Sequence, residues 1–228
     1  MTSAEPERPM TPAEPARQDR YGVVFALLLL SFLVAAVLND NQAKAVTSLL
    51  YVVALVLALR FAQLSARAAR RLRWVVLTGS VLVAVLAAVL PGRVVQGVAA
   101  LWVAALLLVT VVVIVARVLR HRVVTMQTIF GALSAYLLIG FAFAAMFSAT
   151  AALTGRPLFA DGSPVDGSSI QYFAFITLTT TGYGDLTPAG QPGRSLAVLE
   201  ALTGQIFLVT LVARLVAMFG IARQDRRP

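Results

Sequence analysis

The sequence has no cysteine, a single histidine (His121) and a single lysine (Lys44) among its 228 residues. Without cysteine, the chain has no disulfide bonds, thiol catalysis or cysteine-ligated metal sites. One histidine in a basic loop argues against a zinc site, because such a site needs several ligands. Charged residues are also scarce: they make up 13% of the chain, against about 25% in soluble domains.

Hydrophobic residues are abundant instead, at 59% of the chain, where soluble domains have about 45–50%. They are gathered into six stretches that are long enough, or nearly so, to cross a bilayer as helices, since a span needs about 20 residues. We therefore expect an all-α membrane protein, with the third and fourth spans able to form a hairpin around Pro91 and Gly92. The predicted spans are residues 21–38, 45–64, 74–90, 94–116, 126–150 and 195–221.

The net charge of +9 could indicate nucleic-acid binding, but the arginines lie between the apolar stretches. Membrane proteins keep such residues on the cytoplasmic side, so we expect no nucleic-acid partner and place both termini in the cytoplasm. The same clusters can bind anionic lipid, although the positive-inside bias explains them without it. They comprise Arg17, Arg20, Arg67, Arg70, Arg71, Arg73, Arg117, Arg120, Arg122, Arg223, Arg226 and Arg227.

The loop between the last two spans, residues 151–194, is far longer than the others. Its first part, 155–169, is rich in Gly, Pro, Asp and Ser, as an exposed turret would be. Its second part, 168–180, is apolar and aromatic but too short to span a bilayer. We predict a re-entrant helix there, with Ser168 or Ser169 as its N-cap.

The segment that follows reads Thr180-Thr181-Gly182-Tyr183-Gly184-Asp185. Backbone at membrane depth must have its polar groups satisfied unless it lines a cavity. The glycines allow backbone angles that turn successive carbonyls toward one axis. A dehydrated cation would satisfy those carbonyls, and the threonine hydroxyl would add a further oxygen ligand.

This segment resembles the potassium channel signature Thr-Val-Gly-Tyr-Gly-Asp, with Thr181 in place of the common valine. The resemblance implies a selectivity filter formed by residues 180–184, which binds potassium through Thr180, Thr181, Gly182 and Tyr183. No other cofactor is implied. One chain carries one such loop and a ring needs four, so a homotetramer is implied. Short matches also occur in ordinary turns, but the preceding re-entrant helix and the following span argue against that.

The resemblance covers residues 125–221, the module of two helices and a pore loop. Tyr172 and Asp185 match positions that often hydrogen-bond behind the filter in relatives. Ile176 matches a position that is a buried glutamate in some bacterial relatives, which suggests a different pattern of inactivation; plain packing is the alternative.

Glu200 lies inside the last span, where an acid is costly and therefore a functional candidate. We expect it to face protein and to accept hydrogen bonds from Thr177 or Thr179. A water-exposed position in a crevice is the alternative.

The last span carries further candidates for the cavity and gate. Gly204 stands where similar channels have a hinge glycine, although close helix packing explains a glycine equally well. Gln205, Leu208 and Val212 share one helical face, which by resemblance lines the cavity. Arg214 is expected to snorkel toward the cytoplasmic interface or to contact the linker before span five.

Six spans with the pore last is the layout of voltage-gated channels, but span four has no basic residue in its interior and spans one to four contain no acid. A sensor needs both, so we predict no strong voltage sensor. The expected domains are a disordered tail (1–20), a charge-poor four-helix domain (21–122), a pore domain (123–222) and a short tail (223–228).

Two other function classes are considered. A non-conducting or regulatory membrane subunit would keep the pore module only for assembly, and the intact Tyr183 and Asp185 argue against it. An intramembrane enzyme would need a catalytic partner for Glu200, and none is found. The Ala-, Val-, Leu- and Arg-rich composition suggests the inner membrane of a high-GC bacterium.

Overall fold

The computed structural model describes residues 21–37, 66–90, 92–120 and 125–224. Helices occur within five of the predicted spans and in the predicted short segment before residue 180. The predicted span 45–64, the tail 1–20 and residues 225–228 lie outside the described residues. The helices are α1 (Tyr21–Val37), α3 (Ala66–Val89), α4 (Arg93–Arg120), α5 (Met126–Thr154), α6 (Gly167–Leu178) and α7 (Gln191–Gln224).

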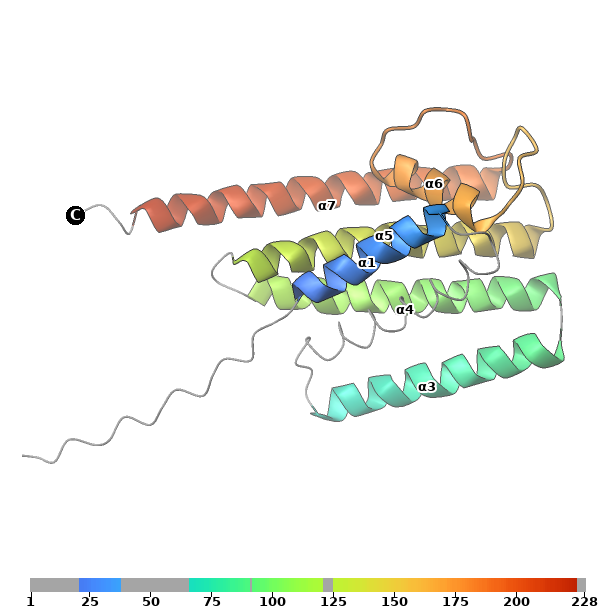
Figure 1. Ribbon diagram of the computed structural model, residues 1–228, viewed down its shortest axis with the longest axis horizontal. Coiled ribbons are helices and arrows are strands. Elements are labelled where there is room, and N and C mark those ends of the chain that lie inside the picture. Colours follow the sequence, from blue (N-terminus) through green and yellow to red (C-terminus); the bar gives the residue numbers. More distant parts are fainter. Residues whose placement is uncertain (1–20, 38–65, 91, 121–124, 225–228) are drawn as a thin grey trace, which may run out of the picture.

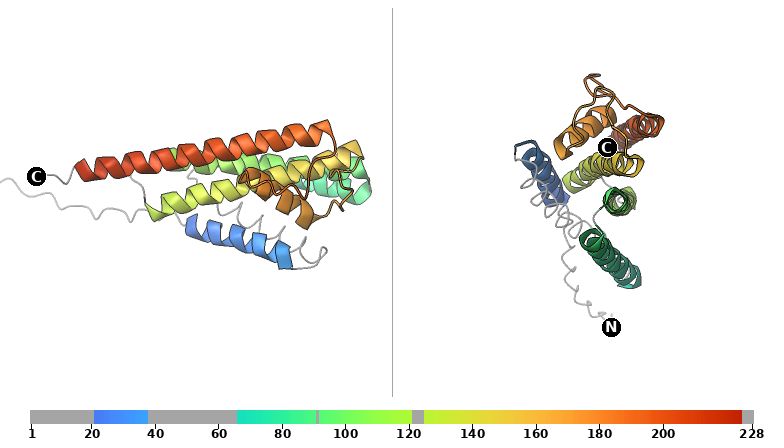
Figure 2. Two further views of the ribbon diagram at one scale, coloured as in Figure 1. Left: turned by 90° about the horizontal axis from the view of Figure 1, so that it is seen from above. Right: turned by 90° about the vertical axis from the view of Figure 1, so that its right-hand side faces the viewer.

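Helix α5 is the centre of the bundle. It packs against α1, α4, α6 and α7, and the end-on view in Figure 2 shows these helices around it. Its most extensive contact is with α4, the helix that precedes it in sequence. Helices α3, α4 and α5 run in alternating directions (Figure 1).

Within the described residues, three helices are long and apolar enough to cross a membrane: Arg93–Arg120, Met126–Thr154 and Gln191–Arg214. Two shorter apolar helical segments, Tyr21–Val34 and Trp74–Val83, accompany them. Helix α7 exposes a run of large apolar side chains that water would solvate poorly. That run comprises Val198, Leu199, Leu202, Ile206, Val209 and Val212. Either lipid or further protein must therefore cover this face.

Asp166, not Ser168 or Ser169 as predicted, is the N-cap of α6. Its Oδ1 accepts hydrogen bonds from the Ser169 backbone N–H at 2.7 Å and from the Ser168 hydroxyl at 2.8 Å. A carboxylate in this position satisfies a backbone donor that the helix itself leaves unpaired. The bond from the Ser169 N–H, ahead of the serine hydroxyl, lowers the pKa of Asp166 below its ordinary value of 3.8.

The turret is less exposed than predicted, because Leu158 and Phe159 are buried. The Ala160 N–H donates to the Thr187 carbonyl and the Ala189 N–H to the Leu158 carbonyl, both at 2.8 Å. These bonds tie the turret to the segment before α7. Two apolar residues in a polar stretch were too weak a signal to predict this pairing.

Aromatic contacts fix α6 against the bundle. The Phe173 ring lies edge-on to Phe147 of α5 and to Phe159 of the turret, with ring centroids 4.9 and 5.5 Å apart. The Phe175 ring similarly meets Phe141 of α5 at 5.2 Å. A side chain at Gly140 would meet the Phe175 ring at 2.7 Å, so glycine is needed for this approach. The end of α6 is thereby held at a fixed place beside α5 and α7.

Candidate functional site

The candidate site is the loop of residues 179–185, which leaves α6 and arches back toward α7 (Figure 1). Residues 179–185 are all exposed in the single chain. Thr180, Gly182 and Gly184 have positive φ angles of 55°, 52° and 82°, whereas Thr181 and Tyr183 do not. Alternation between the two hands places successive N–H groups on one side of the chain and successive carbonyls on the other.

The N–H side of this loop faces α6. The Thr180 N–H donates to the Thr177 carbonyl at 2.9 Å, and the Thr181 and Gly182 N–H groups donate to the Ile176 carbonyl at 2.8 and 3.2 Å. Within the described part of the chain, no backbone N–H donates to the carbonyls of residues 180–184. The first three N–H groups of the filter segment, those of residues 180–182, are therefore bonded to α6, and the carbonyls of residues 180–184 accept no backbone N–H of the described residues.

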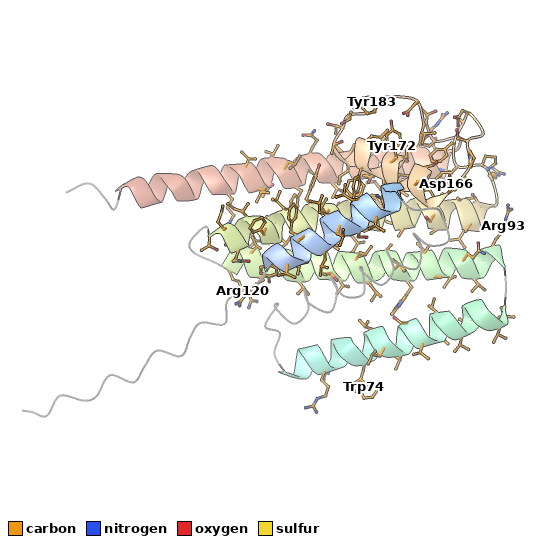
Figure 3. All side chains as sticks on the ribbon, in the orientation of Figure 1. Trp74, Arg93, Arg120, Asp166, Tyr172 and Tyr183 are labelled. Carbon is orange, nitrogen blue, oxygen red and sulfur yellow. The ribbon has the colours of Figure 1, made fainter. Side chains whose placement is uncertain are left out.

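A side-chain hydrogen bond links the last residue of the loop to α6. The Tyr172 hydroxyl on α6 donates to Asp185 Oδ2 at 2.7 Å, as the resemblance led us to expect. Figure 3 shows Tyr172 and Tyr183 at the same end of the molecule, at the α6 end of the bundle. The bond raises the pKa of Tyr172 above its ordinary value, because ionising the phenol would lose it and face the Asp185 carboxylate.

Helix α7 touches the start of the loop through two adjacent residues. The Gln205 side-chain Nε2 donates to the Thr180 hydroxyl oxygen at 2.8 Å. A Cβ atom on Gly204 would lie 2.2 Å from the Leu178 carbonyl oxygen, at the end of α6. Close packing, one of the two expectations for Gly204, is therefore present in the structure; bending at this glycine stays a prediction.

Tyr136 of this junction was not identified from the sequence, and Thr179 was expected to bond to Glu200 instead. The Tyr136 hydroxyl on α5 donates to the same Leu178 carbonyl at 3.4 Å. The Thr179 hydroxyl donates to the Phe175 carbonyl at 2.8 Å. Its oxygen lies 2.9 Å from the Thr181 hydroxyl and can accept a hydrogen bond from it. A tyrosine in the middle of an apolar span was a usable signal, because its hydroxyl needs a partner when buried.

Glu200 is fully buried, which agrees with the expectation that it faces protein, and the alternative of a water-exposed crevice is wrong for this chain. The expected hydrogen bonds from Thr177 or Thr179 are absent, since neither carboxylate oxygen has a partner among the described residues. The Thr179 hydroxyl donates to the Phe175 carbonyl within its own helix, so that donor is already used.

The remaining predicted residues lie farther from the loop or act through their backbone. The Ile176 side chain is buried, so the structure shows packing for it. Its carbonyl accepts the hydrogen bonds from the Thr181 and Gly182 N–H groups. Leu208 is half-buried and Val212 is exposed on α7. Arg214 donates from Nη2 to the Leu119 carbonyl in the last turn of α4 at 3.2 Å, just before the linker to α5.

Side chains do not provide a metal site in the described residues, where no group of three His, Cys, Asp or Glu side chains is found. Any cation here would be bound by the backbone carbonyls and hydroxyl of the loop. Residues 132–220 match the ion channel family. This segment runs from α5 through α6 and the loop to α7. Together with the three long apolar helices, it indicates a membrane protein with a segment similar to ion channels.

A curated relative gives a narrower likeness. The chain is 39% identical over 75 residues to the probable potassium channel protein 2 of Methanocaldococcus jannaschii. The aligned part covers 32% of this chain and 22% of that protein, so the chain spans only a fraction of the relative. No solved structure was found to match the chain.

Proposed function

We propose that the chain is one subunit of a potassium-selective channel, with residues 180–184 as its selectivity filter. The observation that carries the proposal is the alternating φ of Thr180 to Gly184. With the N–H groups of Thr180, Thr181 and Gly182 bonded to α6, we expect the carbonyls of the loop to line up as one row of oxygens. A row of this kind replaces the hydration shell of a potassium ion in channels.

The ligands would be the carbonyls of Thr180, Thr181, Gly182 and Tyr183, with the Thr180 hydroxyl as the innermost oxygen. The Thr181 side chain lies beside Thr179 at the end of α6, so its replacement of a valine leaves the carbonyl available. The carboxyl end of α6 points the negative end of its dipole toward the start of the loop, which favours a cation.

A homotetramer is part of the proposal, because one loop offers only one row of carbonyls. Its loop residues and the apolar face of α7 are exposed in the single chain, as they would be if they faced a shared axis and neighbouring subunits. We further propose six spans, both termini in the cytoplasm, and a bacterial inner membrane as the location.

No strong voltage sensor is proposed. Helix α4 has Arg93 as its first residue and Arg117 and Arg120 in its last turn, with none between. Arginines at the ends of a span cross little of the membrane field, which supplies ~2.3 kcal/mol per charge per 100 mV. The gating stimulus is therefore sought among lipid, pH or the filter itself.

The test is the reversal potential of the purified protein in planar bilayers with mixed potassium and sodium. We expect a reversal potential close to the potassium equilibrium value. Gly182→Ala should abolish the current, because its φ of 52° strains any residue with a side chain. Gly190→Ala should preserve it, because its Cβ would meet only an ordinary contact at 3.8 Å.

The second candidate, a non-conducting membrane subunit, predicts no potassium current from the purified tetramer under any condition.

A further inference from the structure

A cavity of about 390 Å³ opens between α4, α5 and α7. We call it the α4–α7 slot; Val115, Leu119, Ala132, Thr203, Phe207 and Arg214 are among its lining residues. The lining is apolar over most of its surface, and among its described residues the one charged side chain is Arg214. Its volume is that of a small-molecule site.

The slot runs along α7 from Thr203 to Arg214, a distance of eleven residues. At 1.5 Å per residue this is about 16 Å, close to the ~15 Å thickness of one hydrocarbon leaflet. A lipid acyl chain lying parallel to the helices would therefore fill its length. A compact polar ligand would leave most of the apolar lining without a contact.

The end of the slot at Arg214 is strongly cationic. Arg117 and Arg120 lie in the last turn of α4, and Arg214 is anchored to that turn through the Leu119 carbonyl. A guanidinium has five N–H donors, so it can serve a helix carbonyl and a phosphate oxygen together.

The described acids all lie away from that end. Asp161, Asp166 and Asp185 are in the turret and loop region, and Glu200 comes before the slot on α7. Figure 3 shows Arg120 at one end of the bundle and Asp166 at the other. The slot thus combines an apolar trough of leaflet length with a positive mouth.

We propose that the α4–α7 slot binds one anionic phospholipid of the surrounding bilayer, with an acyl chain along α7 and the phosphate at Arg214. The site rests on the proposed membrane insertion of α4, α5 and α7, but not on conduction. Because Arg214 bridges α7 to the end of α4, the bound headgroup would join two helices at the inner end of the proposed gate.

A fluorescent reporter tests occupancy. Trp74 and Trp102 are replaced by Phe, and Leu211→Trp places one tryptophan at another lining residue of the slot. The protein is reconstituted in phosphatidylcholine vesicles containing a brominated lipid, either phosphatidylglycerol or phosphatidylcholine. We expect brominated phosphatidylglycerol to quench at about fivefold lower mole fraction, the effect of one arginine near a headgroup. Equal quenching by the two lipids would refute the anionic preference.

Variants separate the headgroup from the trough. Arg214→Gln should remove the preference and Arg214→Lys should restore most of it, while Arg156→Gln, at the turret end, should leave it unchanged. Thr210→Phe should reduce quenching by both lipids, whereas Val112→Phe, on the exposed face of α4, should not.

Three outcomes would overturn the proposal. Preference retained in Arg214→Gln would place the headgroup elsewhere. Loss in both Arg214 variants would mean that the arginine only supports the Leu119 carbonyl. Absence of quenching by either lipid would mean that protein, such as a second copy of the chain, covers the slot. None of these measurements needs a current, so they are independent of the proposed conduction.

Discussion

Gly204 offers a test of how α7 meets the end of α6. In Gly204→Ala, the new Cβ would lie 2.2 Å from the Leu178 carbonyl oxygen, so this distance must rise by about 1 Å to reach the 3.0–3.4 Å of a tight contact. Helix propensity alone favours alanine by about 1 kcal/mol. Overpacking against a neighbour costs typically about 1–3 kcal/mol, and a backbone carbonyl has less freedom to move than a side chain.

We therefore expect a net loss of about 1–2 kcal/mol, which corresponds to a fall of about 2–8 °C in melting temperature for a chain of this size. The same displacement would lengthen the 2.8 Å bond from Gln205 to Thr180, so potassium flux should fall as well. Thermal unfolding in detergent and flux in vesicles measure the two effects.

The matched control is Gly167→Ala in α6, where a Cβ would meet nothing within 4 Å; it should be neutral or slightly stabilising. If Gly204→Ala is as stable as this control and conducts normally, the close approach of α7 to Leu178 does not exist in the assembled protein. The reasoning about the junction would then be refuted.

Three further predictions concern the same module. Asp166→Ala should cost about 1 kcal/mol of stability through loss of the cap, and the exposed Asp161→Ala should cost less. Because folding lowers the pKa of Asp166, the contribution of the cap should be present above pH 3.8 and should vanish as the pH falls through the folded pKa. Melting temperatures measured across acidic pH would show this loss. Tyr172→Phe removes the bond to its carboxylate partner, so we expect faster loss of current during sustained recording; an unchanged decay would contradict a supporting role. Gln205→Leu should weaken potassium binding at the innermost position, because the Thr180 hydroxyl would lose its donor. Block of the current by internal barium would report the weaker binding, and unaltered block would contradict it.

Several features of the fold followed directly from local sequence. Most helices begin and end near the predicted residues because apolar runs and breakers such as Gly155 mark them; Gly155 is the left-handed cap of α5 with φ 64°. Helix α3 is the exception, since it begins at Ala66 and not at the predicted residue 74. The loop motif was also readable, since only glycine or a strained residue takes positive φ. Thr180 is β-branched, and such residues rarely take a positive φ. Its place in the loop was therefore identified only through the resemblance to a known signature.

Other features could not be derived from one sequence, because they depend on which helices become neighbours. The roles of Tyr136 and the buried pairing of Phe159 come from segments far apart in the chain. The predicted bonds to Glu200 failed for a related reason: its depth in the span could be read from the sequence, but the direction of the nearby Thr179 hydroxyl, which donates to the Phe175 carbonyl, could not.

The sequence by itself determined that the chain has apolar helices and a short loop whose residue types permit aligned carbonyls, because composition and backbone freedom are local properties. The tertiary structure decided what the loop rests on. It turned the N–H groups of residues 180–182 onto α6, brought Gln205 to Thr180, and joined Arg214 to the end of α4. These contacts depend on helix packing, which is set by side chains from distant parts of the chain acting together.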